Sequence, residues 1–213
     1  MAENNNIEQI DELVDNLKVL IALRNLNNGT KLAVTKEQYV NYSPNEYTVD
    51  GIIIRNKDID ADLLFSKTET TAHFAETGEP DIPETDKRRK NANPNPQFTD
   101  LDGMERTAWQ LAYHQDTHES GCAICEAVKF GWLPSGGEMN LASENKEAFN
   151  EIAEIVQATP LNDNKYWLST QYSEDYMWSL DMETNTFEFW WCKTTMMKVR
   201  PVKSASDYIE VEE

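Results

Sequence analysis

Aromatic residues crowd into one stretch of this 213-residue chain, from Tyr166 to Trp191. From Tyr166 onward, four segments have the composition and length of strands and are separated by polar turns. They are residues 166–170, 176–181, 186–192 and 198–203. In the third segment Phe187, Phe189 and Trp191 are expected to share one face, because alternate residues of a strand point the same way. The pattern predicts a compact, β-rich unit at this end of the chain.

The middle of the chain combines strands and helices. Residues 49–55 and 61–66 are expected to pair as a hairpin, and helices are expected over residues 102–114, 119–130 and 137–156. Residues 78–97 hold four of the eight prolines and the basic run from Lys87 to Lys90, which indicates a loop. This run is either a solvated loop or a contact with an acidic neighbouring subunit. The mixture of elements predicts an α+β fold.

The N-terminal region carries an apolar stripe typical of a helix. Its residues are Ile7, Ile10, Val14, Leu17 and Ile21, which step by three and four as in the seam of a coiled coil. An isolated helix over residues 7–25 is marginal in water, so the stripe must pack on something. We expect residues 1–46 to form an attachment segment that joins copies of the chain, as a trimer before a dimer. The alternative is an amphipathic helix packed on its own chain.

The net charge, the N-terminal residues and the cysteine count limit the expected partners of the chain and the compartment in which it is made. The net charge of −19 repels nucleic acid and anionic lipid, so neither nucleic acid nor a membrane is an expected partner. The first residues lack the basic and apolar parts of a signal peptide. Three cysteines do not make a disulfide framework. Together these features predict a soluble protein made in a cytoplasm.

Short blocks of sequence occur in a characteristic order between residues 102 and 203. They are Asp102-Gly103, Arg106-Thr107, Cys125, Gly131-Trp132-Leu133-Pro134-Ser135, Gly137-Glu138-Met139, Tyr166-Trp167-Leu168-Ser169-Thr170-Gln171-Tyr172-Ser173, Trp178, Lys193 and Val199-Arg200-Pro201-Val202. Together they resemble the domain family that includes the FISUMP-type domains and the C-terminal domain of Legionella collagen-like proteins, within the wider C-type-lectin-like fold. Leu168 and Gln171 stand where that family usually has Ser and Glu, and the loop at 78–97 is extra.

The resemblance implies one C-type-lectin-like domain over residues 47–203, with residues 204–213 hanging off it as an acidic tail. Domains of this kind also occur on bacteriophage particles as fibre, decoration and receptor-binding modules. We therefore expect a non-enzymatic virion protein that displays the domain to a host-surface glycan or protein. Its expected partners are copies of itself and capsid or tail proteins. The alternative is a purely structural capsid or tail decoration protein without an outside ligand.

The candidate ligand-binding residues are aromatic or acidic side chains near the expected turns. They are Tyr172, Asp175, Tyr176 and Trp190. Exposed aromatic side chains often mark binding surfaces, although core packing is an equal alternative for the three aromatic residues. Three other tryptophans, Trp167, Trp178 and Trp191, are expected in the core. Arg200 is expected to pair with a buried carboxylate such as Glu138.

Catalytic and metal sites are not expected. The sequence lacks a nucleophile elbow, a phosphate loop and a zinc-protease motif. His114, His118, Cys122 and Cys125 have a spacing that would suit zinc on one continuous helix. Gly121 and the polar residues before it indicate a break, which favours buried thiols and surface histidines. We expect no enzyme activity, no metal and no cofactor.

Overall fold

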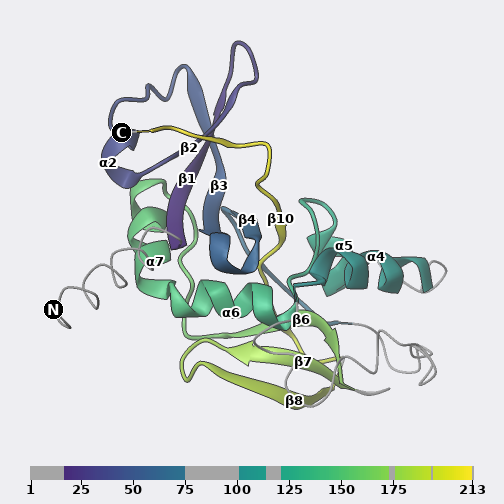
Figure 1. Cartoon of the computed structure of the whole chain (residues 1–213). Helices are drawn as coiled ribbons and strands as arrows, with labels where there is room; N and C mark the ends of the chain where they lie inside the picture. The colour runs from purple at the N-terminus through teal and green to yellow at the C-terminus, as the bar shows by residue number, and fades with distance from the viewer. Residues whose placement is uncertain (1–16, 75–100, 114–120, 173–175, 193, 213) are drawn as a thin grey trace, which may run out of the picture.

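The computed structural model describes residues 17–74, 101–113, 121–172, 176–192 and 194–212 (Figure 1). Two β-sheets and several short helices make up this part of the chain. The α+β class is therefore confirmed. Figure 1 shows helix α6, Gly136–Glu144, between the two sheets, and helix α7, Lys146–Ile155, beside the first of them.

The first sheet has six strands in the order β10-β4-β3-β1-β2-β11. Its strands are β1, Leu17–Asn25; β2, Lys31–Val34; β3, Tyr47–Asn56; β4, Ala61–Ser66; β10, Val202–Ser204; and β11, Ile209–Glu210. β3 and β4 pair antiparallel, with Ile53 opposite Leu64, so the expected hairpin is confirmed. Only glycine fits at position 51, because an added Cβ would lie 2.2 Å from the carbonyl oxygen of Phe65.

The expected N-terminal helix is wrong over the described residues, because Leu17–Asn25 is strand β1. Leu17 and Ile21 pack in the core on one face of the sheet, while Leu20 packs on the other face. A strand buried on both faces reads as a continuous apolar run, which periodicity alone does not separate from a helix. Ile21 is therefore not available as an oligomerisation residue, and Leu17 is half-buried beside it. Ile7, Ile10 and Val14 lie outside the described residues.

Two expected domain limits are also corrected. β1 pairs with both β2 and β3, so the strands of residues 17–34 belong to the same sheet as the strand that begins at Tyr47. The C-terminal residues are not a free tail, since β11 pairs parallel with β2 and Tyr208 is buried. The prediction of a free tail was based on the acidic character of this end. In the structure Glu210 is held in place by ion pairs with Lys18 and Arg55.

The second sheet has five strands in the order β5-β9-β6-β7-β8. They are β5, Thr70–Ala72; β6, Lys165–Gln171; β7, Tyr176–Asp181; β8, Thr186–Cys192; and β9, Met197–Val199. Three of the four expected strands are confirmed. The fourth, at 198–203, is two strands that belong to different sheets, β9 and β10. Arg200 and Pro201 separate them and connect the sheets.

The remaining helices are short. They are α2, Lys36–Tyr39; the 3-10 helix η1, Lys57–Ile59; α4, Gly103–Tyr113; and α5, Ala123–Ala127. The helix expected at 102–114 is confirmed. The helix expected at 137–156 is divided into α6 and α7 at Asn145, whose side chain donates to the carbonyl oxygen of Leu141 at 2.7 Å. Such a side-chain bond competes with the helical backbone pattern.

Arg200 pairs with a different carboxylate from the one expected. It is fully buried and lies 3.2 Å from Glu69, to which Tyr166 also donates a hydrogen bond. Glu138 instead accepts hydrogen bonds from Trp132 Nε1 and from the backbone of Ser135, and with Ser135 it caps α6. The pairing with Glu138 was wrong because the connection between the sheets places Arg200 beside β5 and its preceding residues.

Ion pairs on the outer side of the first sheet lower the pKa of two carboxyls. Burial alone would raise the pKa of Asp50, but hydrogen bonds from Arg24 and Tyr208 outweigh it and the pKa lies below its ordinary value. The pKa of Glu210 is lowered in the same way by two cations that outweigh its partial burial. Both groups therefore stabilise the fold in their ionised form.

We expect the free energy of unfolding to fall as the pH drops below about 4. A carboxyl with a lowered folded-state pKa stabilises above its unfolded pKa, and this contribution is lost as the pH falls through the folded value. The change Asp50→Asn should make stability less dependent on pH in this window. Urea unfolding at neutral pH and at about pH 3 measures the difference. An unchanged dependence in the variant would contradict the assignment.

Candidate functional site

The expected ligand-binding residues lie around the β6–β7 hairpin and the edge strand β8. The backbone N–H of Tyr172 donates to the carbonyl oxygen of Tyr176 at 3.1 Å, which brings the two tyrosines together at the end of the hairpin. Tyr172 is 38% exposed and Tyr176 is half-buried. Asp175 lies outside the described residues. Trp190 is part of β8, and its side chain is not among those described.

Tyr172 belongs to a packed group of three rings, the Tyr172 cluster, with Trp178 and Phe189. The rings of Tyr172 and Phe189 stack with centroids 4.3 Å apart and an interplanar angle of 27°. Trp178 meets both edge-on, at 5.5 Å from Tyr172 and 5.2 Å from Phe189. Trp178 is buried, as expected. The cluster therefore presents one partly exposed aromatic ring on a rigid aromatic base.

A β-bulge in β8 separates Trp191 from the phenylalanines with which it was expected to share a face. Trp191 lies opposite Met177, whereas Glu188 lies opposite Ser179, so two residues of β8 face the single residue Trp178. An extra residue in one strand reverses the alternation beyond it. Phe189 consequently packs in the main core, while Trp191 packs with Met177 against the smaller core behind the second sheet.

Trp191 lines a groove of about 320 Å³ on this second face, which we call the Trp191 groove. Its other lining residues are Thr71, Asn164, Lys165, Thr195, Met196, Met197 and Lys198. Trp191 was expected in the core but is half-buried, because helix α5 and its neighbours cover the rest of this sheet face and not the groove. The sequence reasoning missed this residue because the bulge is not visible in the alternation of β8.

A hydrogen-bonded network holds the indole of Trp191. Its Nε1 donates to Glu188, and Lys165 Nζ lies 2.7 Å from the same carboxylate and 2.5 Å from Asp181. Burial alone would lower the pKa of Lys165, but its bonds to the two carboxylates outweigh it and the pKa is raised. Lys165 Nζ also lies 5.3 Å from the centroid of the Trp191 ring. These contacts between side chains of the chain itself fix the orientation of the ring.

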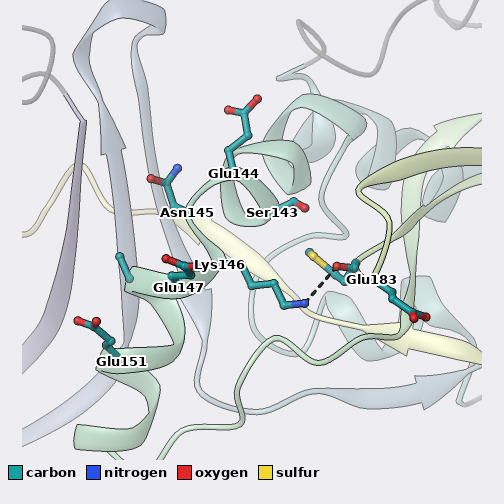
Figure 2. Close-up of a pocket in the computed structure, with 9 residues that line it drawn as sticks. Ser143, Glu144, Asn145, Lys146, Glu147, Glu151 and Glu183 are labelled. Carbon is teal, nitrogen blue, oxygen red and sulfur yellow. Dashed lines mark hydrogen bonds between the residues drawn. The ribbon is translucent and has the colours of Figure 1, made fainter. Parts of the chain in front are cut away.

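A second pocket, of about 600 Å³, lies where α6 meets α7, beside the β7–β8 turn (Figure 2). Its charged lining consists of Glu144, Glu147, Glu151, Glu183 and Lys146. Figure 2 shows Lys146 reaching across the pocket, where it donates to the carbonyl oxygen of Met182 at 3.1 Å. Lys146 also pairs with Asp163. The acidic lining disfavours anionic ligands, and the sequence reasoning did not identify this pocket.

Cys122 has a structural role at the start of α5. Cys122 is buried and caps α5, since its Sγ accepts a hydrogen bond from the backbone of Cys125 at 3.2 Å. Burial raises the pKa of Cys122 to about 12, so the thiol stays protonated near neutral pH. His114 and His118 lie outside the described residues. Within the described ranges no three His, Cys, Asp or Glu side chains are grouped so as to hold a metal ion.

In the described part of the chain, none of the helices has the length and apolar character needed to cross a membrane.

Comparisons with known proteins leave the family of this chain open. No protein-family model and no curated protein matches it. Among solved structures it is similar to a fimbrial protein from Bacteroides ovatus ATCC 8483, with a TM-score of 0.52 and 16% sequence identity. The similarity covers 66% of this chain and 35% of that protein, so this chain spans about a third of its relative's length. At this identity the likeness concerns the fold alone.

Proposed function

We propose that this chain is a non-enzymatic display protein whose C-type-lectin-like domain binds a glycan or protein on a host surface. In this proposal it is a fibre or decoration protein of a bacteriophage virion, held there by copies of itself and by capsid or tail proteins. Because Ile21 lies in the core, the proposed self-association would use Ile7, Ile10 and Val14.

The positions in the structure of three of the sequence blocks that resemble the C-type-lectin-like family support a lectin-like domain. Leu133, Pro134 and Ser135 lead into the capped start of α6, with Glu138 completing the cap. The block that begins at Tyr166 forms most of β6. The Val-Arg-Pro-Val block ends β9, crosses between the sheets and begins β10. These three blocks therefore form the start of α6, the central strand of the second sheet and the connection between the two sheets.

The observation that carries a binding role is the pair of aromatic surfaces on the second sheet. Tyr172 is exposed on one face, Trp191 lines a groove on the other, and both rings are held by neighbouring side chains. Rigid, partly exposed aromatic side chains lose little entropy on binding.

A purely structural decoration role is the second candidate. It is favoured by the packing of Tyr172, whose ring already stacks on Phe189 and meets Trp178. Under this alternative the aromatic side chains stabilise the second sheet and contact no outside ligand. The protein would then be present in purified particles and would bind neither cells nor glycans.

The double change Tyr172→Ala and Tyr176→Ala is expected to weaken binding to intact host cells or arrayed glycans by about tenfold. It removes the exposed ring of Tyr172 and keeps Trp178 and Phe189, on which that ring packs. Val40→Ala is a suitable control, because Val40 is 80% exposed and lies just after α2, beside the first sheet. Equal binding by wild type and the double variant would argue against this surface.

A further inference from the structure

We propose that the Trp191 groove is a subsite for an uncharged sugar unit of a glycan. This inference rests on the proposed display function and names the ligand class of one surface. The groove combines an aromatic ring fixed in position, hydroxyl and amide side chains at its rim, and charges that already have partners.

The first argument is the fixed ring. The hydrogen bond from Trp191 Nε1 to Glu188 holds one edge of the indole, and Lys165 pairs with the same carboxylate oxygen. The C–H groups on one face of a sugar ring are apolar and interact favourably with the negative face of an aromatic ring. A preformed ring avoids the entropic cost of ordering a mobile side chain on binding.

The second argument is the rim. Thr71 and Thr195 supply hydroxyls and Asn164 supplies an amide, and all three line the groove with Trp191. Hydroxyl and amide groups both donate and accept hydrogen bonds, as sugar hydroxyls do. An apolar floor with a few polar groups is the usual composition of a small-molecule site.

The third argument is charge. The two lysines that line the groove are already paired, Lys165 with Asp181 and Glu188, and Lys198 with Glu69 at 3.1 Å. Behind them Arg200 also pairs with Glu69. The ion pairs that involve these lysines and Glu69 therefore join three cations to three carboxylates, although the chain as a whole has a net charge of −19. An anionic or cationic ligand would have to disrupt these pairs, whereas an uncharged ligand would not.

The fourth argument concerns the open side of the groove. Met196 is 57% exposed at this side, whereas Met197 is buried beneath it. A methionine side chain adapts its shape to what it contacts, so Met196 can close over a sugar ring. The acidic pocket of Figure 2 lacks an aromatic ring among its lining residues and is a poorer site for this ligand.

The test uses the full chain on an array that carries uncharged and acidic oligosaccharides, the latter sialylated or containing uronic acids. The strongest uncharged ligand is then titrated by tryptophan fluorescence and by saturation-transfer NMR. We expect Trp191→Ala to weaken its affinity by at least about tenfold, and Trp191→Phe to weaken it less, because Phe keeps an aromatic ring but lacks the N–H that bonds to Glu188. Thr195→Ala should weaken binding by a smaller factor, and it keeps the test valid if Trp191→Ala does not fold. Met104→Ala, at an exposed residue of α4, should leave affinity unchanged.

The outcomes separate the two proposals. If the chain binds a glycan or a cell surface and the Trp191 and Thr195 variants bind equally well, the groove assignment is wrong and the display function stands. Binding of acidic glycans alone, or of host protein alone, also overturns the groove assignment and leaves display intact. If the wild-type chain binds neither arrayed glycans nor host cells, both proposals fail and the structural decoration role remains.

Discussion

Replacing Arg200 with Met is expected to lower the free energy of unfolding by about 3–5 kcal/mol. Arg200 is fully buried and donates to the carbonyl oxygens of Ser66 at 2.8 Å and Thr159 at 2.6 Å. Met removes these bonds and leaves Glu69, which is itself buried, without one of its cations. A buried group that loses its partner bears the full cost of desolvation. Urea unfolding of the wild type and the variant measures the loss.

Arg24→Met is the matched control for this prediction. Arg24 makes a bidentate ion pair with Asp50, but the side chain of Arg24 is 47% exposed. Solvent screens such a pair, so the loss should be no more than about 1 kcal/mol. Similar losses of unfolding free energy in the two variants would show that the burial of Arg200 does not account for its contribution to stability.

Removing residues 205–213 should prevent the chain from folding. Ala205 and Tyr208 cover the outer face of the first sheet. The residues that they cover are Leu20, Ala22, Ala33, Ile53 and Leu64. Each large apolar side chain exposed to water costs about 1.5–3 kcal/mol, and the sum is comparable to the whole stability of a domain. Circular dichroism and solubility of the truncated chain measure the result.

Two smaller changes make this test specific. Removing only residues 212–213 should have no effect, because the last backbone hydrogen bond among the described C-terminal residues is from Val211 to the carbonyl oxygen of Ala33. Tyr208→Ala should cost about 3 kcal/mol, since the ring is buried and its hydroxyl bonds to Asp50. A chain without residues 205–213 that unfolds at the wild-type midpoint would mean that the C-terminal residues are a free tail after all.

Part of the candidate site was accessible from the sequence. The strands around Tyr172 and Tyr176 were predicted because alternating residues and polar turns are local features. Trp178 is buried as expected, and Tyr172, for which exposure and core packing were equal alternatives, is 38% exposed. The position of Trp191 was not predictable, because one extra residue in β8 turns its side chain to the opposite face of the sheet.

The amino-acid sequence by itself determined those elements whose signals lie within a few residues. These include the strands from Tyr166 to Cys192 and the helix that begins at Gly103. Only the tertiary structure decided that residues 17–25 form a strand, that the acidic C-terminus joins the first sheet, and that Arg200 pairs with Glu69. The physical reason is that burial on two faces and the pairing of distant charges depend on contacts between residues far apart in the chain, which local patterns do not encode.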